Sequence, residues 1–348
     1  MRRILFILIC GLLLASYSAT GAPNDTIRIG DHSALQAERF YNEGIRLLKL
    51  NQAEEAIKQF EQAIAAYPSY APAFYNRGVA KLSQFDFRVA IDDFNKALEL
   101  NPELTMGYIA RGNALSELGD QAGAMKNFDQ ALKLNPDHYI GWHLRGVSWY
   151  WQGEYGKAVQ DLSKSIELKP DFAPAWNDRG SARQRAGNLN GAMADFQQAL
   201  MLDPTMHFAF NNMGHLRNQM QQYNEALEFF TTAIRLNPNY AIAFNNRGIA
   251  RFNLELYNEA VVDYTRAIEL NPVFTEAFNN RGNARYKLND LEGAITDFNQ
   301  AITLNPSYAE AYLNRGIVRE MIRDLEGAEK DWQKALELGL TIAESYLK

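Results

Sequence analysis

The sequence predicts an all-α fold, a solenoid of about nine helix-turn-helix repeats that ends in a short C-terminal capping helix. Three observations lead to this fold class. Glycine and proline each recur at a step of 34 residues, aromatic residues and alanines recur in the same frame, and little of the chain after residue 22 lies outside that frame. A fixed period of this length is typical of stacked repeats, in which each repeat packs on its neighbours.

The recurring glycine sets the frame. If it is position 8 of a 34-residue unit, the repeats span residues 37–340. Proline at position 32 of the first eight repeats stops each second helix, because it cannot continue the backbone hydrogen bonding. The nine repeats start at Ala37, Ala71, Thr105, Tyr139, Ala173, His207, Ala241, Thr275 and Ala309.

The remaining skeleton positions are small or aromatic. Position 4 is always aromatic, position 20 is always alanine, position 27 is alanine except for Ser165, and position 24 is aromatic except for Leu162. Small residues let two antiparallel helices approach closely, and the aromatic rings fill the remaining space. This pattern resembles the tetratricopeptide-repeat family over residues 37–340. The resemblance implies a right-handed superhelix whose concave face is lined mainly by the first helices.

Residues 1–22 are predicted to be a secretory signal peptide. Arg2 and Arg3 precede a twelve-residue apolar run, residues 4–15, and small and polar residues follow. As a helix this run would rise about 18 Å, short of the roughly 30 Å hydrocarbon core, so cleavage is preferred to a permanent membrane span. We expect cleavage after Ala22 or Gly21, export through the secretory route, and a periplasmic or secreted protein if the source is bacterial.

The two ends of the array are expected to differ from its middle. Residues 23–36 are predicted to be a linker, poorly ordered as far as His32, with Ser33 and Gln36 forming a capping box for the first helix. Residues 341–348 follow the last repeat. Because Ala343 and Tyr346 match positions 1 and 4, this segment is predicted to pack as a truncated capping helix.

Composition disfavours several functional classes. Without Arg2 and Arg3 the chain has 33 basic and 41 acidic side chains, a formal charge of −8, which disfavours nucleic acid and anionic lipid as partners. Cys10 is the only cysteine, so the mature chain has no thiolate nucleophile or thiolate metal site. The five histidines lack the spacing of metal ligands, and no glycine-rich phosphate loop is present. We therefore predict neither metal nor cofactor, and no catalytic function.

Candidate binding residues lie on the first helices. The resemblance implies ligand contacts at positions 2, 5, 6, 9, 12 and 13 of each repeat. Asparagines recur at positions 5 and 6, and a carboxamide can pair with the peptide bond of an extended ligand because it both donates and accepts. The alternative is that these asparagines bond only the local backbone. The candidates are Asn177, Asn211, Asn212, Asn245, Asn246, Asn279, Asn280 and Asn314.

Two aromatic residues of the fourth repeat are further candidates. Tyr150 and Trp151 occupy positions 12 and 13, where large exposed rings are typical anchors for a partner. The alternative is that they pack against the neighbouring repeat. Position 5 holds no lysine in any repeat, so the terminal-carboxylate clamp of related chaperone-binding proteins is not expected.

The preferred function is an exported scaffold that binds a protein or peptide in a concave groove. The alternatives are a glycan-binding envelope protein, because tryptophan and tyrosine faces also stack on sugars, a purely structural protein, and an enzyme. No combination of nucleophile, base and orienting residue supports the last of these.

One position departs from the family pattern. Position 7 is usually leucine in the family but is arginine in seven repeats here, and six of these arginines precede an aspartate by sixteen residues, at position 23. If the turn is centred near position 15, positions 7 and 23 oppose each other. We therefore predict a partly buried bridge within each repeat, the alternative being that both side chains are solvated. The pairs are Arg77–Asp93, Arg145–Asp161, Arg179–Asp195, Arg247–Asp263, Arg281–Asp297 and Arg315–Asp331.

Overall fold

The computed structural model describes residues 32–347 as an all-helical chain. This range contains eighteen α-helices and one 3₁₀ helix, and it contains no strand. The predicted all-α fold with helices in repeating pairs is confirmed. The predicted signal peptide, and the predicted linker up to residue 31, lie outside the described residues.

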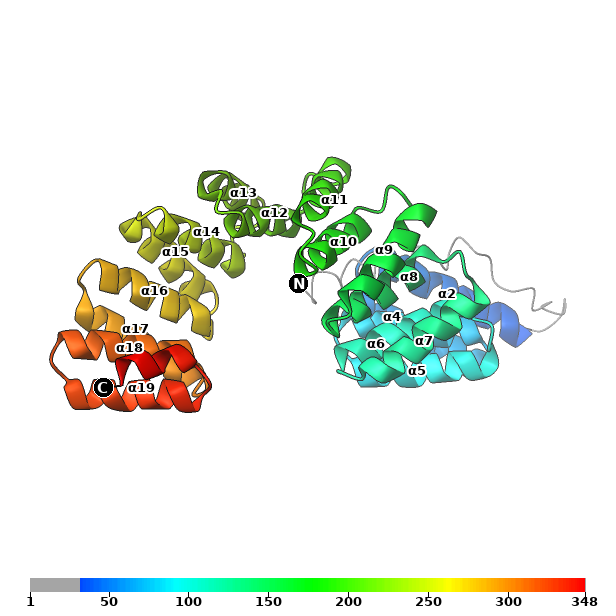
Figure 1. Cartoon of the computed structure of the whole chain (residues 1–348). Helices are drawn as coiled ribbons and strands as arrows, with labels where there is room; N and C mark the ends of the chain where they lie inside the picture. Colours follow the sequence, from blue (N-terminus) through cyan, green and yellow to red (C-terminus); the bar gives the residue numbers. More distant parts are fainter. Residues whose placement is uncertain (1–31, 348) are drawn as a thin grey trace. The chain divides into compact units, whose positions relative to one another are not determined.

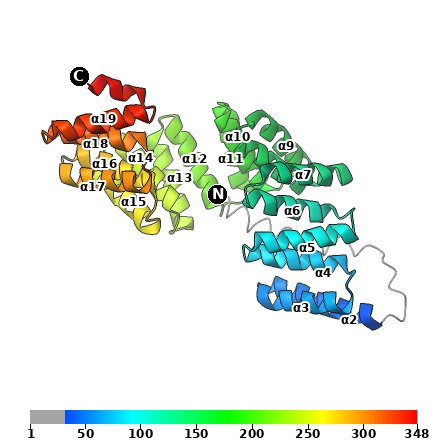
Figure 2. The ribbon, with the colours of Figure 1, turned by 90° about the horizontal axis from the view of Figure 1, so that it is seen from below.

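The helices form two compact halves, one ending at Asn188 and the other beginning at Leu189 (Figures 1 and 2). The N-terminal half contains α2 His32–Lys49, α3 Ala53–Ala66, α4 Ala71–Ser83, α5 Phe87–Leu100, α6 Thr105–Glu117, α7 Gln121–Leu134, α8 Tyr139–Trp151, α9 Tyr155–Leu168 and α10 Ala173–Arg185. The C-terminal half contains α11 Leu189–Leu202, α12 His207–Gln219, α13 Tyr223–Leu236, α14 Ala241–Asn253, α15 Tyr257–Leu270, α16 Thr275–Lys287, α17 Leu291–Leu304, α18 Ala309–Met321, α19 Leu325–Glu337 and η1 Thr341–Tyr346.

In each repeat that lies within one half, the two helices touch where the glycine at position 8 meets the side chain at position 24. A Cβ added to Gly248 on α14 would lie 2.6 Å from the ring of Tyr264 on α15, and one on Gly112 would lie 2.7 Å from Phe128. Both rings are essentially buried. Glycine is therefore required here because any side chain would push the two helices apart.

The turn between the two helices is centred on position 15. This residue has a left-handed backbone in every repeat, with φ between 59° at Asn51 and 89° at Gly119. Glycine adopts this conformation without strain, and asparagine tolerates it better than most residues. The position of this turn places position 7 opposite position 23, as the sequence analysis assumed.

The predicted bridge between positions 7 and 23 is confirmed in five repeats. The guanidinium nitrogens lie 2.6–2.7 Å from the carboxylate oxygens, and both side chains are largely buried, with exposed fractions of 13–19% for arginine and 2–9% for aspartate. The sixth pair, Arg179 and Asp195, has one member in each half and stays a prediction. The confirmed pairs are Arg77–Asp93, Arg145–Asp161, Arg247–Asp263, Arg281–Asp297 and Arg315–Asp331.

Each bridging arginine also makes contacts that the sequence analysis did not predict. Its guanidinium lies over the aromatic ring at position 4, 4.7 Å from the Trp142 ring centre for Arg145, which is a favourable cation–π contact. Its Nη1 reaches position 25 of the preceding repeat, as in the 2.7 Å bond from Arg145 to Asp129. One arginine therefore joins both helices of its own repeat and connects that repeat to its neighbour.

The residue at position 23 determines how strongly the charged form of the largely buried arginine is stabilised. Hydrogen bonding to Asp161 raises the pKa of Arg145 above its ordinary value, whereas desolvation lowers the pKa of Arg111, whose partner is the neutral Asn127 at 2.8 Å. Burial destabilises the guanidinium cation, and a hydrogen-bonded carboxylate offsets that effect.

The N-terminal end departs from the expectation, and the C-terminal end agrees with it. Ser33 lies inside α2, which includes His32, so it does not occupy the predicted N-cap, and the structure extends the helix into the predicted linker. Residues 341–346 form a 3₁₀ helix. Their packing is as predicted, because Ala343 is buried and the Tyr346 ring lies 5.3 Å from that of Trp332.

We expect Arg145→Met and Asp161→Phe each to lower the free energy of unfolding by up to about 3 kcal/mol, because each leaves a partly buried charge without its partner. The double variant should recover much of this loss, since the sixth repeat packs Met213 and Phe229 at the same positions. Denaturant unfolding of the four proteins measures the coupling. Strictly additive single effects would show that the bridge contributes nothing.

Candidate functional site

The asparagines of the C-terminal half hydrogen-bond one another between repeats. The side-chain nitrogen at position 6 donates to the side-chain oxygen at position 5 of the preceding repeat, 35 residues earlier in the chain. We refer to these bonds as the amide links. They differ from the local backbone bonds that the sequence analysis considered as the alternative to ligand contact. The three links, each 3.0 Å long, run from Asn246 to Asn211, from Asn280 to Asn245 and from Asn314 to Asn279.

Burial separates the two members of each amide link. The position-5 members of the links are at most 5% exposed, as are Asn177 and Asn212, whereas Asn246, Asn280 and Asn314 are half-buried. A ligand cannot reach the buried carboxamides without opening the helix packing. Of the eight asparagines predicted to contact a ligand, the structure therefore leaves three at the surface. The five that it buries are Asn177, Asn211, Asn212, Asn245 and Asn279.

In the N-terminal half the same two positions are joined by other side chains. Asn76 donates to the hydroxyl of Tyr41 at 3.1 Å, and His143 Nε2 lies 2.8 Å from Asp178 Oδ2. His143 is fully buried, and its ring meets that of Phe172 edge to face. The link between positions 5 and 6 is thus a recurring way of joining neighbouring repeats, and its chemistry changes along the chain.

The two candidate aromatic residues of the fourth repeat, Tyr150 and Trp151, differ in how far they are buried. Trp151 is 45% exposed, whereas Tyr150 is half-buried and packs against Ala158, Leu162 and Ala182. Burial of the phenol raises the pKa of Tyr150 above its ordinary value. Of the two predicted anchors, Trp151 is therefore the one with a substantial accessible surface.

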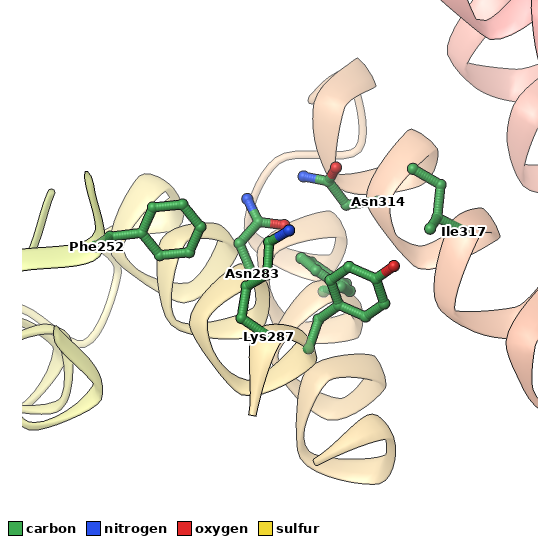
Figure 3. Close-up of a pocket in the computed structure, with 7 residues that line it drawn as sticks. Phe252, Asn283, Lys287, Asn314 and Ile317 are labelled. Carbon is green, nitrogen blue, oxygen red and sulfur yellow. The ribbon is translucent and has the colours of Figure 1, made fainter. Parts of the chain in front are cut away.

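A pocket of about 200 Å³ opens on the first helices of repeats 7 to 9 (Figure 3). All of its lining residues belong to the C-terminal half. Apolar side chains form most of its surface, and they include the buried Phe298 of the second helix α17. The lining residues are Phe252 of α14, Asn283, Tyr286 and Lys287 of α16, Phe298, and Asn314 and Ile317 of α18.

Two carboxamides enter this pocket with different hydrogen bonding. Asn314 is one of the predicted ligand residues, and its nitrogen is already donated to Asn279 in an amide link. Asn283 lies on the neighbouring helix and makes no side-chain hydrogen bond within residues 32–347. Figure 3 shows the Asn283 side chain between those of Phe252 and Asn314. Asn283 therefore keeps its full capacity to donate and accept.

Most of this pocket was not singled out from the sequence. Only Asn314 was among the predicted residues, although Asn283, Tyr286 and Lys287 occupy positions 9, 12 and 13, which the family resemblance had indicated. The usable signal was a set of large or polar side chains at non-skeleton positions in consecutive repeats. The regular recurrence of asparagine at positions 5 and 6 is explained by links between repeats.

The described residues offer no metal centre and no membrane-spanning helix. No group of three His, Cys, Asp or Glu side chains is arranged to hold a metal ion within residues 32–347. Over the same range no helix is both long and apolar enough to traverse a lipid bilayer.

Family models for the tetratricopeptide repeat match more than half of the chain. The matches cover residues 41–104, 106–138, 173–206, 207–240, 241–274 and 282–321. The chain therefore belongs to the tetratricopeptide-repeat family, and its fold is the helical scaffold of that family.

Solved structures share this fold at low sequence identity. A tetratricopeptide repeat protein from Parabacteroides merdae is 19% identical with a TM-score of 0.56, and the match covers 70% of this chain and 97% of that one. A chain of the APC/C hetero-tetramer Cut9–Hcn1 is 17% identical with a TM-score of 0.64, covering 98% and 82%. No curated protein sequence matches this chain. These likenesses concern the fold alone.

Substitutions of two asparagines on α16 distinguish an amide that links repeats from an amide that makes no internal hydrogen bond. Asn280→Ala should lower the free energy of unfolding by about 1–2 kcal/mol, because it leaves the buried oxygen of Asn245 without its donor. Asn283→Ala is the matched control, and it should leave stability within about 0.5 kcal/mol because its amide is not used internally. Equal effects of the two substitutions in thermal or denaturant unfolding would show that the amide links do not stabilise the array.

Proposed function

We propose that this protein is an exported, non-catalytic scaffold that binds another protein or a peptide on the face formed by its first helices. The observation that carries this proposal is the pocket across α14, α16 and α18. Apart from Phe298, its walls come from positions 6, 9, 12 and 13, none of which belongs to the packing skeleton of the repeat. Side chains held on rigid helices in this way suit contact with a partner.

The family and the fold relatives support this function. Tetratricopeptide-repeat proteins are generally scaffolds without catalytic activity. The Cut9–Hcn1 relative comes from a hetero-tetramer, an assembly of protein chains. A repeat scaffold changes its partner by substituting surface residues while its fold stays constant.

Export is the second part of the proposal, and it rests on the N-terminal 22 residues. When the full chain is produced in a bacterium with its own N-terminus, we expect the product to begin at Pro23 or Ala22, because cleavage follows the small residues there. N-terminal sequencing of the protein from the periplasmic fraction measures this. Recovery of a chain that still carries Arg2 and Arg3 in the cytoplasm would refute export.

Binding is tested with a pair of charge substitutions. Residues 23–348 are immobilised, and peptides are selected from a random display library. Ile317→Glu places a charge in the apolar pocket, so the selected peptides should lose affinity by at least about tenfold, which corresponds to about 1.4 kcal/mol. Val262→Glu is the control, since this residue is 65% exposed on the second helix α15 and does not line the pocket.

Circular dichroism melting confirms that both variants are folded before affinities are compared. If no peptide is enriched, or if both substitutions weaken binding equally, the pocket is not the binding site.

The exposed Trp151 favours glycan binding as the second candidate, because an accessible indole face stacks on sugar rings. Titrating tryptophan fluorescence with envelope polysaccharides distinguishes the two functions. A response to polysaccharide in a protein that enriches no peptide would replace the peptide scaffold with a glycan-binding protein.

A further inference from the structure

The pocket of repeats 7 to 9 contains a polar group that the fold does not require. Position 9 is isoleucine in the flanking repeats, as Ile249 and Ile317, but it is Asn283 in repeat 8. An apolar side chain is therefore tolerated at this position of the helix stack. The free carboxamide of Asn283 must find partners when a ligand covers it, because a buried unpaired amide is unfavourable.

The two carboxamides of the pocket match the main chain of a ligand. Asn283 offers a donor and an acceptor, and Asn314 retains its oxygen and one N–H after its link to Asn279. A peptide bond presents the complementary acceptor and donor. Because two such groups lie on adjacent helices, they suit an extended segment that passes over both.

The cations of α16 are not all neutralised in the same way. Arg281 and Arg285 both bind the buried carboxylate of Asp297, at 2.7 and 2.9 Å. Lys287 lines the pocket at the end of the helix, is exposed, and makes no ion pair within the described residues. Its ammonium lies 5.7 Å from the centre of the Tyr286 ring, another wall of the pocket. The pocket therefore carries one uncompensated positive charge at its edge.

The apolar walls of the pocket determine which side chain of the ligand can fill it. Phe252, Tyr286, Phe298 and Ile317 surround a volume of about 200 Å³, which suits a single large side chain. Filling it with an apolar group removes water from these walls and supplies most of the binding energy, while the polar groups at the edge select the ligand.

We propose that this pocket binds an extended internal segment of a protein in which an aspartate or glutamate stands two residues from a large apolar residue, so that both side chains face the pocket. The apolar side chain fills the pocket, the acidic side chain contacts Lys287, and Asn283 and Asn314 hold the main chain. This inference rests on the proposed function and adds the class of sequence that the scaffold recognises. An internal segment is favoured over a chain terminus because the pocket offers two amides for peptide bonds and only one cation.

The test selects random peptides on residues 23–348 in two display formats. In one format both peptide ends are fused to the carrier, and in the other the C-terminus is free. We expect enrichment in the doubly fused format of sequences that combine Leu, Ile or Phe with an Asp or Glu two residues away. Enrichment only with a free C-terminus, or enrichment without an acidic residue, would overturn the inference while leaving the scaffold function intact. No enrichment in either format would contradict both.

A matched set of variants then assigns the contacts. End-capped synthetic peptides of the selected sequence are measured by fluorescence anisotropy. Lys287→Gln should weaken binding about threefold to fivefold, the size expected for an exposed ion pair, and should have no effect on the peptide whose acidic residue is changed to its amide. Lys334→Gln is the control, because Lys334 is similarly exposed on α19 but pairs with Glu337.

Asn283→Ile supplies the second readout, since isoleucine is the residue of the flanking repeats and should preserve folding. We expect about a tenfold loss of affinity for every selected peptide, whatever its acidic residue, because the ligand main chain loses its partner. Unchanged affinity in Asn283→Ile, or equal effects of Lys287→Gln on the acidic and amidated peptides, would show that the selected peptides are held elsewhere.

Discussion

The close approach of two helices at the glycine of each repeat is the constraint on which the rest of the structure depends. Because Gly248 leaves no room for even a methyl group beside Tyr264, the two helices meet at a fixed distance. That distance brings position 7 of the first helix against position 23 of the second. The arginine and aspartate there can form a short, largely buried bridge only because the glycine lies one residue further along the helix. The charged pair thus depends on the close approach of the two helix backbones.

Features inside a repeat were predictable from the sequence, whereas features between repeats mostly were not. The bridge between Arg145 and Asp161 could be inferred by comparing the repeats with one another, because the repeats without the arginine also lack the aspartate. The amide links required knowing that position 6 faces position 5 of the repeat before, a relation set by stacking. The pocket depended on the same stacking, because all of its walls except Phe298 come from three successive first helices. Ser33 was misplaced because a capping pattern does not exclude a helix that begins earlier.

Polar side chains on the first helices serve two distinct purposes. Asn245 and its equivalents are buried and join one repeat to the next, so their recurrence reflects a structural role. Asn283 breaks that regularity and makes no side-chain hydrogen bond within the described residues. Lys287, which also lines the pocket, makes no ion pair within them. In a repeat protein the irregular positions are therefore the more informative ones for binding, since the regular ones are accounted for by stacking.

The contacts between neighbouring repeats also differ in whether a whole repeat could be lost from the gene without leaving mismatched side chains. If recombination removed residues 275–308, Asn314 would meet Asn245 in place of Asn279, and Arg315 would reach Thr265 in place of Asn299, so both contacts would have suitable partners. Removal of residues 139–172 would instead set Asp178 against Ile109, leaving a carboxylate beside an apolar side chain. The amide-linked repeats are interchangeable modules, whereas the joint between His143 and Asp178 can be inherited only as a pair.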